Sequence, residues 1–110
     1  MLNDQQFRDL ADEALTKLQR ALEHASDSHD FDVESNQGAL AIEFEDPPAK
    51  FVVSPNSPVR QIWVSARVKS FKLDWNDASH AFVLAGDGRS LQQLIADVIG
   101  EQTGEAVELV

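Results

Sequence analysis

The sequence predicts an α+β fold of two layers, in which two terminal helices pack on one face of an antiparallel sheet of about six strands. Three observations predict it. An amphipathic stretch opens the chain, and a second one closes it. Between them lie six short apolar or alternating runs that are separated by turn residues. Strands with such short links pair as an antiparallel meander, and helices at both ends of the sheet region are expected to cover one face.

Composition and charge exclude several classes of function. The sequence has no cysteine, so disulfides, thiolate metal sites and cysteine nucleophiles are excluded. Nineteen acidic and nine basic residues give a net charge of −10, which would repel the phosphates of nucleic acid. No apolar run approaches the roughly 18 residues of a membrane span, and the first residues lack the features of a secretory signal or transit peptide. We therefore expect a cytoplasmic, bacterial protein without nucleic-acid or membrane partners, with its 110 residues in one domain.

The charge is unevenly distributed along the chain. Residues 1–46 hold twelve acids and three bases (net −9), residues 47–89 hold three acids and six bases (net +3), and residues 90–110 hold four acids and no base (net −4). This distribution predicts a surface with two signs of charge, which helps to orient a partner.

Residues 4–25 are predicted to form an amphipathic helix. Apolar side chains recur at steps of three and four residues from Phe7 to Ala25, and Asn3 or Asp4 can cap the N-terminus. At about 100° per residue, four acidic side chains fall on the opposite face; they are Asp9, Asp12, Glu13 and Glu23. Taken alone, these carboxylates are most simply a solvated helix face.

The next part of the chain carries the signals of a hairpin and a third strand. Residues 31–35 and 39–45 alternate apolar and polar side chains, and the turn between them ends in Gly38. Two prolines then interrupt the pattern, and residues 50–54 form a third short strand. The apolar side chains are expected on the core side, and the acidic ones on the outer face or at an edge.

The fourth strand, predicted to begin at Arg60, carries an unusual tryptophan. Ile62 and Val64 point to one face, whereas Trp63 lies between polar neighbours on the other face. Composition alone favours a buried tryptophan, but the helices are expected to cover only one face of the sheet. An exposed Trp63 would be an anchor for a protein partner, because tryptophan is enriched at binding hot spots.

Two further strands, a helix and a tail complete the prediction. Residues 70–75 alternate cleanly, and residues 80–84 form a short sixth run. Ser90 is a good N-cap for a helix that runs to about residue 103, and Gly104 is placed to end it. The tail, residues 105–110, is expected to lie back along the helices.

Catalytic motifs are scarce, and the chemistry that remains is weak metal binding. The sequence contains no phosphate-binding loop, dinucleotide fingerprint or nucleophile elbow. The histidines lack HExxH-type spacing, although His24 and His29 lie near several acids. Carboxylates with an occasional imidazole bind hard or borderline divalent cations, and exposed ligands without a fixed geometry bind them weakly. We therefore expect a protein that is not an enzyme.

Several motifs resemble the frataxin family, and the resemblance covers nearly the whole chain. The most specific of them is the run Gln-Ile-Trp-Val-Ser at residues 61–65. The others lie at residues 3–12, 36–44, 73–75, 87–91 and 104–107. The resemblance implies an α/β sandwich with two helices on one face of an antiparallel sheet, which is also the fold that the hydrophobic pattern predicts.

The resemblance implies an iron-binding regulator or iron chaperone of iron–sulfur cluster assembly. Members of the family bind ferrous and ferric iron weakly on an acidic ridge along the first helix and first strand. They dock on the cysteine desulfurase and face the scaffold protein of cluster assembly. By position, the candidate metal ligands are Asp4, Asp9, Asp12, Glu13, Glu23, His24, Asp27, Asp30, Asp32 and Glu34, and other divalent cations are expected to bind there too. The candidate partner-binding residues are Arg60, Gln61, Trp63 and Lys72.

The chain departs from the bacterial members of the family in ways that thin the ridge. Gln19, Arg20 and His24 stand where those members carry acids late in the first helix. Ser26 and Ser28 likewise replace acids in the following loop. The resemblance therefore implies a lower affinity or stoichiometry for iron here, or partial compensation by His24.

Two alternatives remain open beside this hypothesis. The first is an iron-oxidising or iron-storing oligomer with weak ferroxidase activity, although the sequence lacks the Glu-x-x-His pairs of buried di-iron sites. The second is an acidic interaction domain without a metal role. The leading hypothesis expects a monomer, which oligomerises, if at all, in the presence of iron.

Overall fold

Over the residues that the structure describes, the chain folds as a helix, six strands and a second helix, in the order that the sequence predicts. The structure is a computed structural model, and it describes residues 3–27, 29, 31–36, 38–45, 48–66, 69–84, 86–104, 107 and 109. The helices are α1 (Asp4–Ser26) and α2 (Leu91–Thr103), and a short 3₁₀ helix, η1 (Ser57–Val59), precedes the fourth strand. The strands are β1 (Asp32–Asn36), β2 (Ala39–Glu45), β3 (Pro48–Asn56), β4 (Gln61–Ala66), β5 (Lys69–Asn76) and β6 (Ala81–Leu84).

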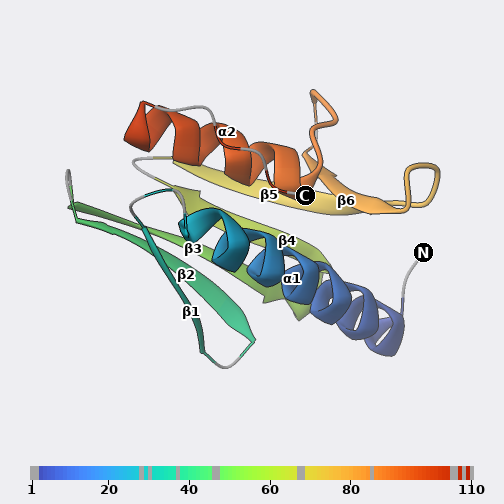
Figure 1. The fold of residues 1–110 in the computed structure, drawn as a ribbon. Coiled ribbons are helices and arrows are strands. Elements are labelled where there is room, and N and C mark those ends of the chain that lie inside the picture. The colour runs from blue at the N-terminus through green and yellow to red at the C-terminus, as the bar shows by residue number, and fades with distance from the viewer. Residues whose placement is uncertain are drawn as a thin grey trace.

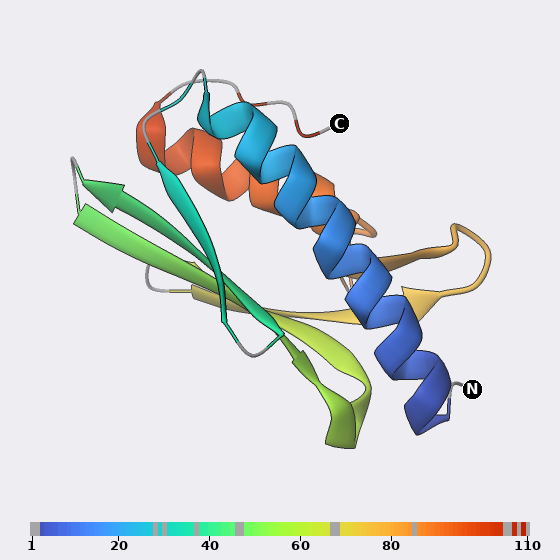
Figure 2. The ribbon, with the colours of Figure 1, turned by 60° about the horizontal axis from the view of Figure 1, so that its bottom comes forward.

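The strands form an antiparallel meander. Each strand pairs with its neighbours in sequence, so the order across the sheet is β1-β2-β3-β4-β5-β6. Both helices lie on the same face of this sheet and run in the same general direction (Figure 1, Figure 2). The predicted two-layer α+β sandwich is therefore confirmed, and within the described part of the chain the other face of the sheet carries no helix.

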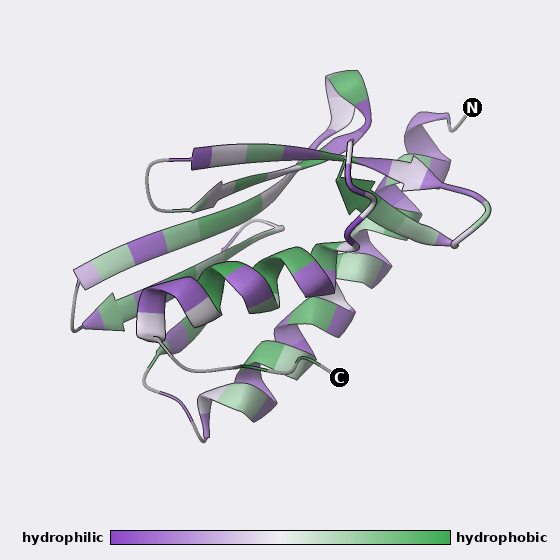
Figure 3. Ribbon diagram, turned by 90° about the horizontal axis from the view of Figure 1, so that it is seen from above, coloured by the Kyte–Doolittle hydropathy of each residue, from purple (hydrophilic) through white to green (hydrophobic). Residues whose placement is uncertain are grey.

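The helix α1 is built by its N-cap and by one apolar stripe. Asn3 Oδ1 accepts the backbone N–H of Gln6 at 2.8 Å, and Gln6 Oε1 accepts the backbone N–H of Asn3 at 3.0 Å. This reciprocal capping box satisfies two donors at the helix start. The buried stripe consists of Phe7, Ala11, Leu15, Leu18, Ala21, Leu22 and Ala25. Figure 3 shows hydrophilic segments interleaved with hydrophobic ones along the helix, as the amphipathic pattern requires.

The core lies between the helices and the inner face of the sheet. In β4 the side chains alternate: Ile62 and Val64 are buried, whereas Trp63 and Ser65 are exposed. β2 follows the same alternation, with its large apolar residues on the core side. A shift of either strand by one residue would move its apolar row into water. Because full burial of such a side chain stabilises the fold by roughly 1.5–3 kcal/mol, the alternation fixes the register.

The fourth strand begins one residue later than predicted, and the connection before it contains a helical turn. Residues 57–59 form η1, and Arg60 has a left-handed backbone with φ 52° and ψ 48°. Since a strand needs extended backbone, Arg60 is not its first residue. The pattern of apolar and polar side chains carries no signal for this conformation, because arginine seldom adopts it.

The third strand is longer than the predicted residues 50–54. It begins at Pro48 and runs through Pro55 to Asn56. Proline lacks an N–H and is tolerated at strand starts and where one side of a strand is unpaired. Pro48 is the first residue, and Pro55 lies beyond Val53, where the pairing with β2 ends. The other predicted elements agree with the structure to within one residue at each end.

The helix α2 begins and ends where the sequence predicts. Ser90 Oγ accepts the backbone N–H of Gln93 at 3.3 Å, and the left-handed Gly104, with φ 75°, donates its N–H to the Gly100 carbonyl at 2.8 Å. Val107 and Leu109 of the tail are buried against the core, as expected; the rest of the tail lies outside the described residues. No helix in the described part of the chain has the length and apolarity that a membrane crossing requires.

Candidate partner surface and acidic residues

The outer face of the sheet, which the helices leave open, carries an exposed tryptophan. The side chain of Trp63 is 37% exposed, and the only other large hydrophobic residue that is exposed within the described part of the chain is Val59 of η1. The predicted exposure of Trp63 is therefore confirmed. The strand pairing places Trp63 opposite Lys72 and Gln61 opposite Asp74. We refer to Gln61, Trp63, Lys72 and Asp74 as the Trp63 patch.

The side chains of the Trp63 patch are joined in a chain of contacts. Trp63 Nε1 donates to Gln61 Oε1 at 3.0 Å, and Gln61 Nε2 donates to Asp74 Oδ1 at 3.0 Å. Lys72 Nζ lies 5.0 Å from the centre of the Trp63 ring. Such an exposed cation–π contact contributes about 0.5–1 kcal/mol. The indole is thus held on both sides while its ring stays accessible.

Asp74 belongs to this patch but was not among the predicted partner-binding residues. It lies two residues after Lys72 in β5, and side chains two apart in a strand share a face. The alternation of residues 70–75 was thus a signal that could have placed Asp74 on the same face as Lys72. What the sequence could not give is the pairing of β4 with β5 in register, on which the hydrogen bond depends.

Arg60, a predicted partner-binding residue, does not belong to the Trp63 patch. Its Nη2 donates to Oδ1 of Asp4 at 2.8 Å, which ties the loop before β4 to the start of α1. Its Nε is buried, and within the described part of the chain it has no hydrogen-bond partner. Asp4 is one of the predicted metal ligands. The structure therefore pairs a predicted partner-binding residue, Arg60, with a predicted metal ligand.

The predicted metal ligands of α1 lie on its solvent-exposed side, as expected. Asp9, Asp12, Glu13 and Glu23 are all exposed. Asp9 accepts a hydrogen bond from Gln5 Nε2 at 2.9 Å. Glu13 forms an ion pair with Lys17 at 3.1 Å. These local partners are one helical turn away, and exposed pairs of this kind contribute only about 0.3–0.5 kcal/mol.

The remaining candidates lie at the end of α1 and on β1. His24 and Asp27 are exposed at the last turn and C-cap of the helix. Asp32 and Glu34 are exposed on the edge strand β1, opposite Glu43 and Ala41 of β2. Since Val33 between them packs against the core, both carboxylates point to the outer face of the sheet. Asp30 lies outside the described residues.

The structure does not gather these acids into one cluster. The helix acids lie on the helix layer and the strand acids on the opposite face of the sheet. Within the residues that the structure describes, no group of three histidine, aspartate or glutamate side chains is close enough to hold a metal ion. The donors have the hard oxygen chemistry that suits iron, but they do not form a chelating cage.

Three comparisons with known proteins relate this chain to others. The sequence profile of the Frataxin-like domain matches residues 1–105. The chain is 33% identical over 109 residues to the iron-sulfur cluster assembly protein CyaY of Azotobacter vinelandii, with 97% of this chain and 94% of that protein covered. It is also 33% identical over 108 residues to the protein of the same name from Dechloromonas aromatica, covering 98% and 99%. Among solved structures, the frataxin of Psychromonas ingrahamii superposes with a TM-score of 0.85 over 99% of both chains, at 24% identity.

Proposed function

Because this chain belongs to the frataxin-like family, we propose that it acts in iron–sulfur cluster assembly, as a non-enzymatic adaptor that binds iron weakly and docks on a cysteine desulfurase and its scaffold protein. The curated relatives are bacterial proteins named for this process, and we place the activity in the bacterial cytoplasm. The observation that carries the docking proposal is the exposed Trp63, held in an ordered patch on the sheet face without helices.

The Trp63 patch has the properties of a protein-binding hot spot. Tryptophan is enriched at such sites because it buries a large surface and loses little rotamer entropy. Here Gln61 and Lys72 already hold the ring in place, so docking would order few further side chains. Lys72 supplies a positive charge beside the ring, which favours a partner surface with acidic side chains next to an apolar pocket.

Docking is tested with purified desulfurase and two variants of this chain. We expect Trp63→Ala to weaken the complex at least about tenfold, which corresponds to the 1.4 kcal/mol that a hot-spot residue exceeds. The matched control is Val59→Ala, which removes the other exposed large hydrophobic side chain. It should leave the affinity unchanged. Equal affinities for wild type and Trp63→Ala, measured by titration calorimetry, would refute docking through this face.

Iron is the cargo in this proposal, and the acids attract it mainly through charge. Asp12, Glu23, Asp32 and Glu34 are exposed carboxylates without ion-pair partners among the described residues. These carboxylates are spread over α1 and β1, so each element offers only one or two of them as ligands to a hydrated cation. Binding of this kind is weak and falls with ionic strength.

Anaerobic titration with ferrous iron tests this part of the proposal. We expect paramagnetic broadening of the amide resonances around Asp12, Glu23 and Asp32, and its loss in the triple variant Asp12→Asn/Glu23→Gln/Asp32→Asn. A matched control neutralises acids elsewhere, with Asp77→Asn and Asp97→Asn. If sub-millimolar iron leaves α1 and β1 unaffected, the chain is an interaction domain without a metal role. Iron oxidation that is coupled to growth in particle mass would instead favour the storage oligomer.

A further inference from the structure

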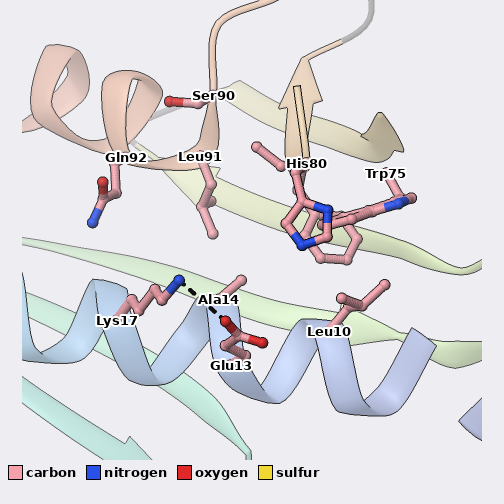
Figure 4. A pocket seen from close by; sticks show the side chains of 11 residues that line it. Leu10, Glu13, Ala14, Lys17, Trp75, His80, Ser90, Leu91 and Gln92 are labelled. Carbon is pink, nitrogen blue, oxygen red and sulfur yellow. Dashed lines mark ion pairs between the residues drawn. The ribbon is translucent and has the colours of Figure 1, made fainter. Parts of the chain in front are cut away.

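A cavity of about 210 Å³ opens between the two helices and the sheet. Its walls come from α1, from β5, β6 and the turn between them, and from the start of α2 (Figure 4). It lies on the helix-covered side, away from the Trp63 patch. Of the candidate iron ligands that the structure describes, only Glu13 reaches its rim. The proposed function therefore gives this cavity no role.

The wall of the cavity is aromatic and firmly held. Trp75 and Phe82 meet edge to face, with ring centres 5.2 Å apart, and Phe82 is anchored in turn against Phe7 at 5.9 Å. The indole N–H of Trp75 donates to Asp77 Oδ1 at 2.6 Å. A cavity of roughly 150 Å³ lined by apolar side chains accepts benzene in another protein. A single or fused aromatic ring is thus the size of group that fits here.

His80 is held in a strained backbone conformation at the mouth of the cavity. Its φ of 53° lies in the left-handed region, which is unfavourable for a non-glycine residue. The conformation sets its imidazole against the edge of Trp75, with ring centres 4.9 Å apart. Strain of this kind concentrates at ligand sites, and here it places a hydrogen-bonding ring at the entrance.

The polar groups at the rim favour an anion over a cation. Lys17 carries a positive charge, and His80 and the Gln92 amide can donate hydrogen bonds, whereas Glu13 is the one acid among the described residues of the lining. Lys17 pairs with Glu13 at 3.1 Å, but their side chains are 67% and 59% exposed, so the pair is weak. Lys17 can therefore turn toward a carboxylate at the mouth at little cost.

We propose that this cavity is a binding site for a small aromatic carboxylate, with its ring packed against Trp75 and its carboxylate near Lys17 and His80. The half-open shape and the small number of polar contacts imply a Kd on the order of 1 mM for a simple probe. The site is separate from the Trp63 patch, so its occupancy and desulfurase docking can be measured independently.

The two tryptophans of the chain provide the readout. In nitrogen-15-labelled protein, each tryptophan gives one indole N–H resonance. The resonance that disappears in Trp63→Phe belongs to Trp63, and the other belongs to Trp75. Titration with indole-3-acetate is expected to shift the Trp75 resonance and leave that of Trp63 in place. Tryptamine carries the same ring with a positive charge, and acetate carries the carboxylate without a ring; both are expected to bind at least about threefold more weakly.

Two variants, each with a matched control, locate the site. Ala14→Leu should fill the cavity and abolish the shift, whereas Thr16→Leu adds the same side chain on the exposed side of α1 and should not. Lys17→Gln should weaken indole-3-acetate about threefold. Lys50→Gln removes a lysine from another exposed ion pair and should have no effect. A dispersed amide spectrum for each variant shows that it is folded.

Three results would overturn the proposal. The first is the absence of a Trp75 shift at about 10 mM indole-3-acetate. The second is binding that survives in folded Ala14→Leu, which would put the ligand elsewhere. The third is equal or tighter binding of tryptamine, which would refute the preference for an anion.

Discussion

At the scale of single residues, Gln61 holds the partner surface together because its side-chain amide contacts both neighbours. The amide oxygen accepts from the Trp63 indole, and the amide nitrogen donates to Asp74. Oxygen and nitrogen of an amide differ little in shape, so a rotation of the group by half a turn would present a donor to the indole N–H. A carboxylate accepts only, and Asp74 therefore fixes the orientation that Trp63 needs. Asp74 is a positioning residue for Trp63.

Substitution of Asp74 tests this role. In Asp74→Ala the Gln61 amide loses its acceptor, so we expect the Trp63 indole N–H resonance to move and desulfurase binding to weaken between about twofold and tenfold, the worth of one net hydrogen bond. Asp74→Asn retains a carbonyl oxygen and should restore both values. An indole resonance that stays in place in Asp74→Ala would show that the Gln61 orientation does not depend on Asp74.

At the scale of elements, Arg89 fastens the loop after β6 to α2. Its Nε donates to Asp87 Oδ2 at 3.0 Å, and its Nη1 donates to Asp97 Oδ2 at 2.9 Å. The Asp87 carboxylate also accepts the backbone N–H of Arg89 at 2.9 Å. That backbone hydrogen bond, followed by the contacts with the Arg89 side chain, lowers the pKa of Asp87 below its ordinary value of 3.8. The same loop positions the N-cap of α2.

The lowered pKa of Asp87 gives stability a definite dependence on pH. A carboxyl whose pKa falls on folding stabilises the native state above its ordinary pKa, and this contribution is lost as the pH falls through the folded value. Asp87→Asn should therefore unfold at a lower urea concentration than wild type at pH 7. The difference should shrink progressively as the pH falls below 3.8, the ordinary pKa of the carboxyl. A difference that is constant or grows on acidification would contradict this assignment.

The capping box of α2 is the second test at this scale. Ser90→Ala removes the acceptor of the Gln93 N–H, and we expect a loss of about 1 kcal/mol in the free energy of unfolding. Ser70 on the outer face of β5 is exposed, and Ser70→Ala should change that free energy by less than about 0.5 kcal/mol. Urea denaturation of both variants measures the contrast. If Ser90→Ala and Ser70→Ala lowered the free energy of unfolding equally, the Ser90 cap would contribute no more to stability than an exposed serine hydroxyl does.

At the scale of the whole molecule, the fold followed from local patterns, and the exceptions depended on distant contacts. Alternation predicted the strands and the exposure of Trp63, and the caps Ser90 and Gly104 set the limits of α2. The left-handed conformation of Arg60 was missed because arginine seldom adopts it, and its pairing with Asp4 was missed because the two residues lie 56 positions apart. The ridge of acids along α1 and β1 was implied by the family resemblance and stays a prediction; α1 packs against β1, whose Asp32 and Glu34 point to the outer face of the sheet.

The net charge of −10 acts on the molecule as a whole. The principal extents are 41 × 29 × 25 Å. The Debye length is about 30 Å at 0.01 M salt and about 10 Å at 0.1 M. At the lower salt concentration, every exposed acid therefore repels acids across the whole protein. At the higher salt concentration, it repels only the acids close to it. Folding brings these charges together, so repulsion destabilises the native state at low salt.

Salt should therefore raise the thermal stability, and the exposed acids should carry the effect. We expect the unfolding midpoint to rise between about 0.01 M and 0.1 M sodium chloride. The rise should be smaller in Asp12→Asn/Glu23→Gln/Asp32→Asn, which has three fewer negative charges, and larger in Lys50→Gln/Lys69→Gln, which has two fewer positive ones. Scanning calorimetry of the three proteins measures these slopes. An order of slopes that does not follow net charge would show that local contacts, and not the summed repulsion, govern the stability of the fold.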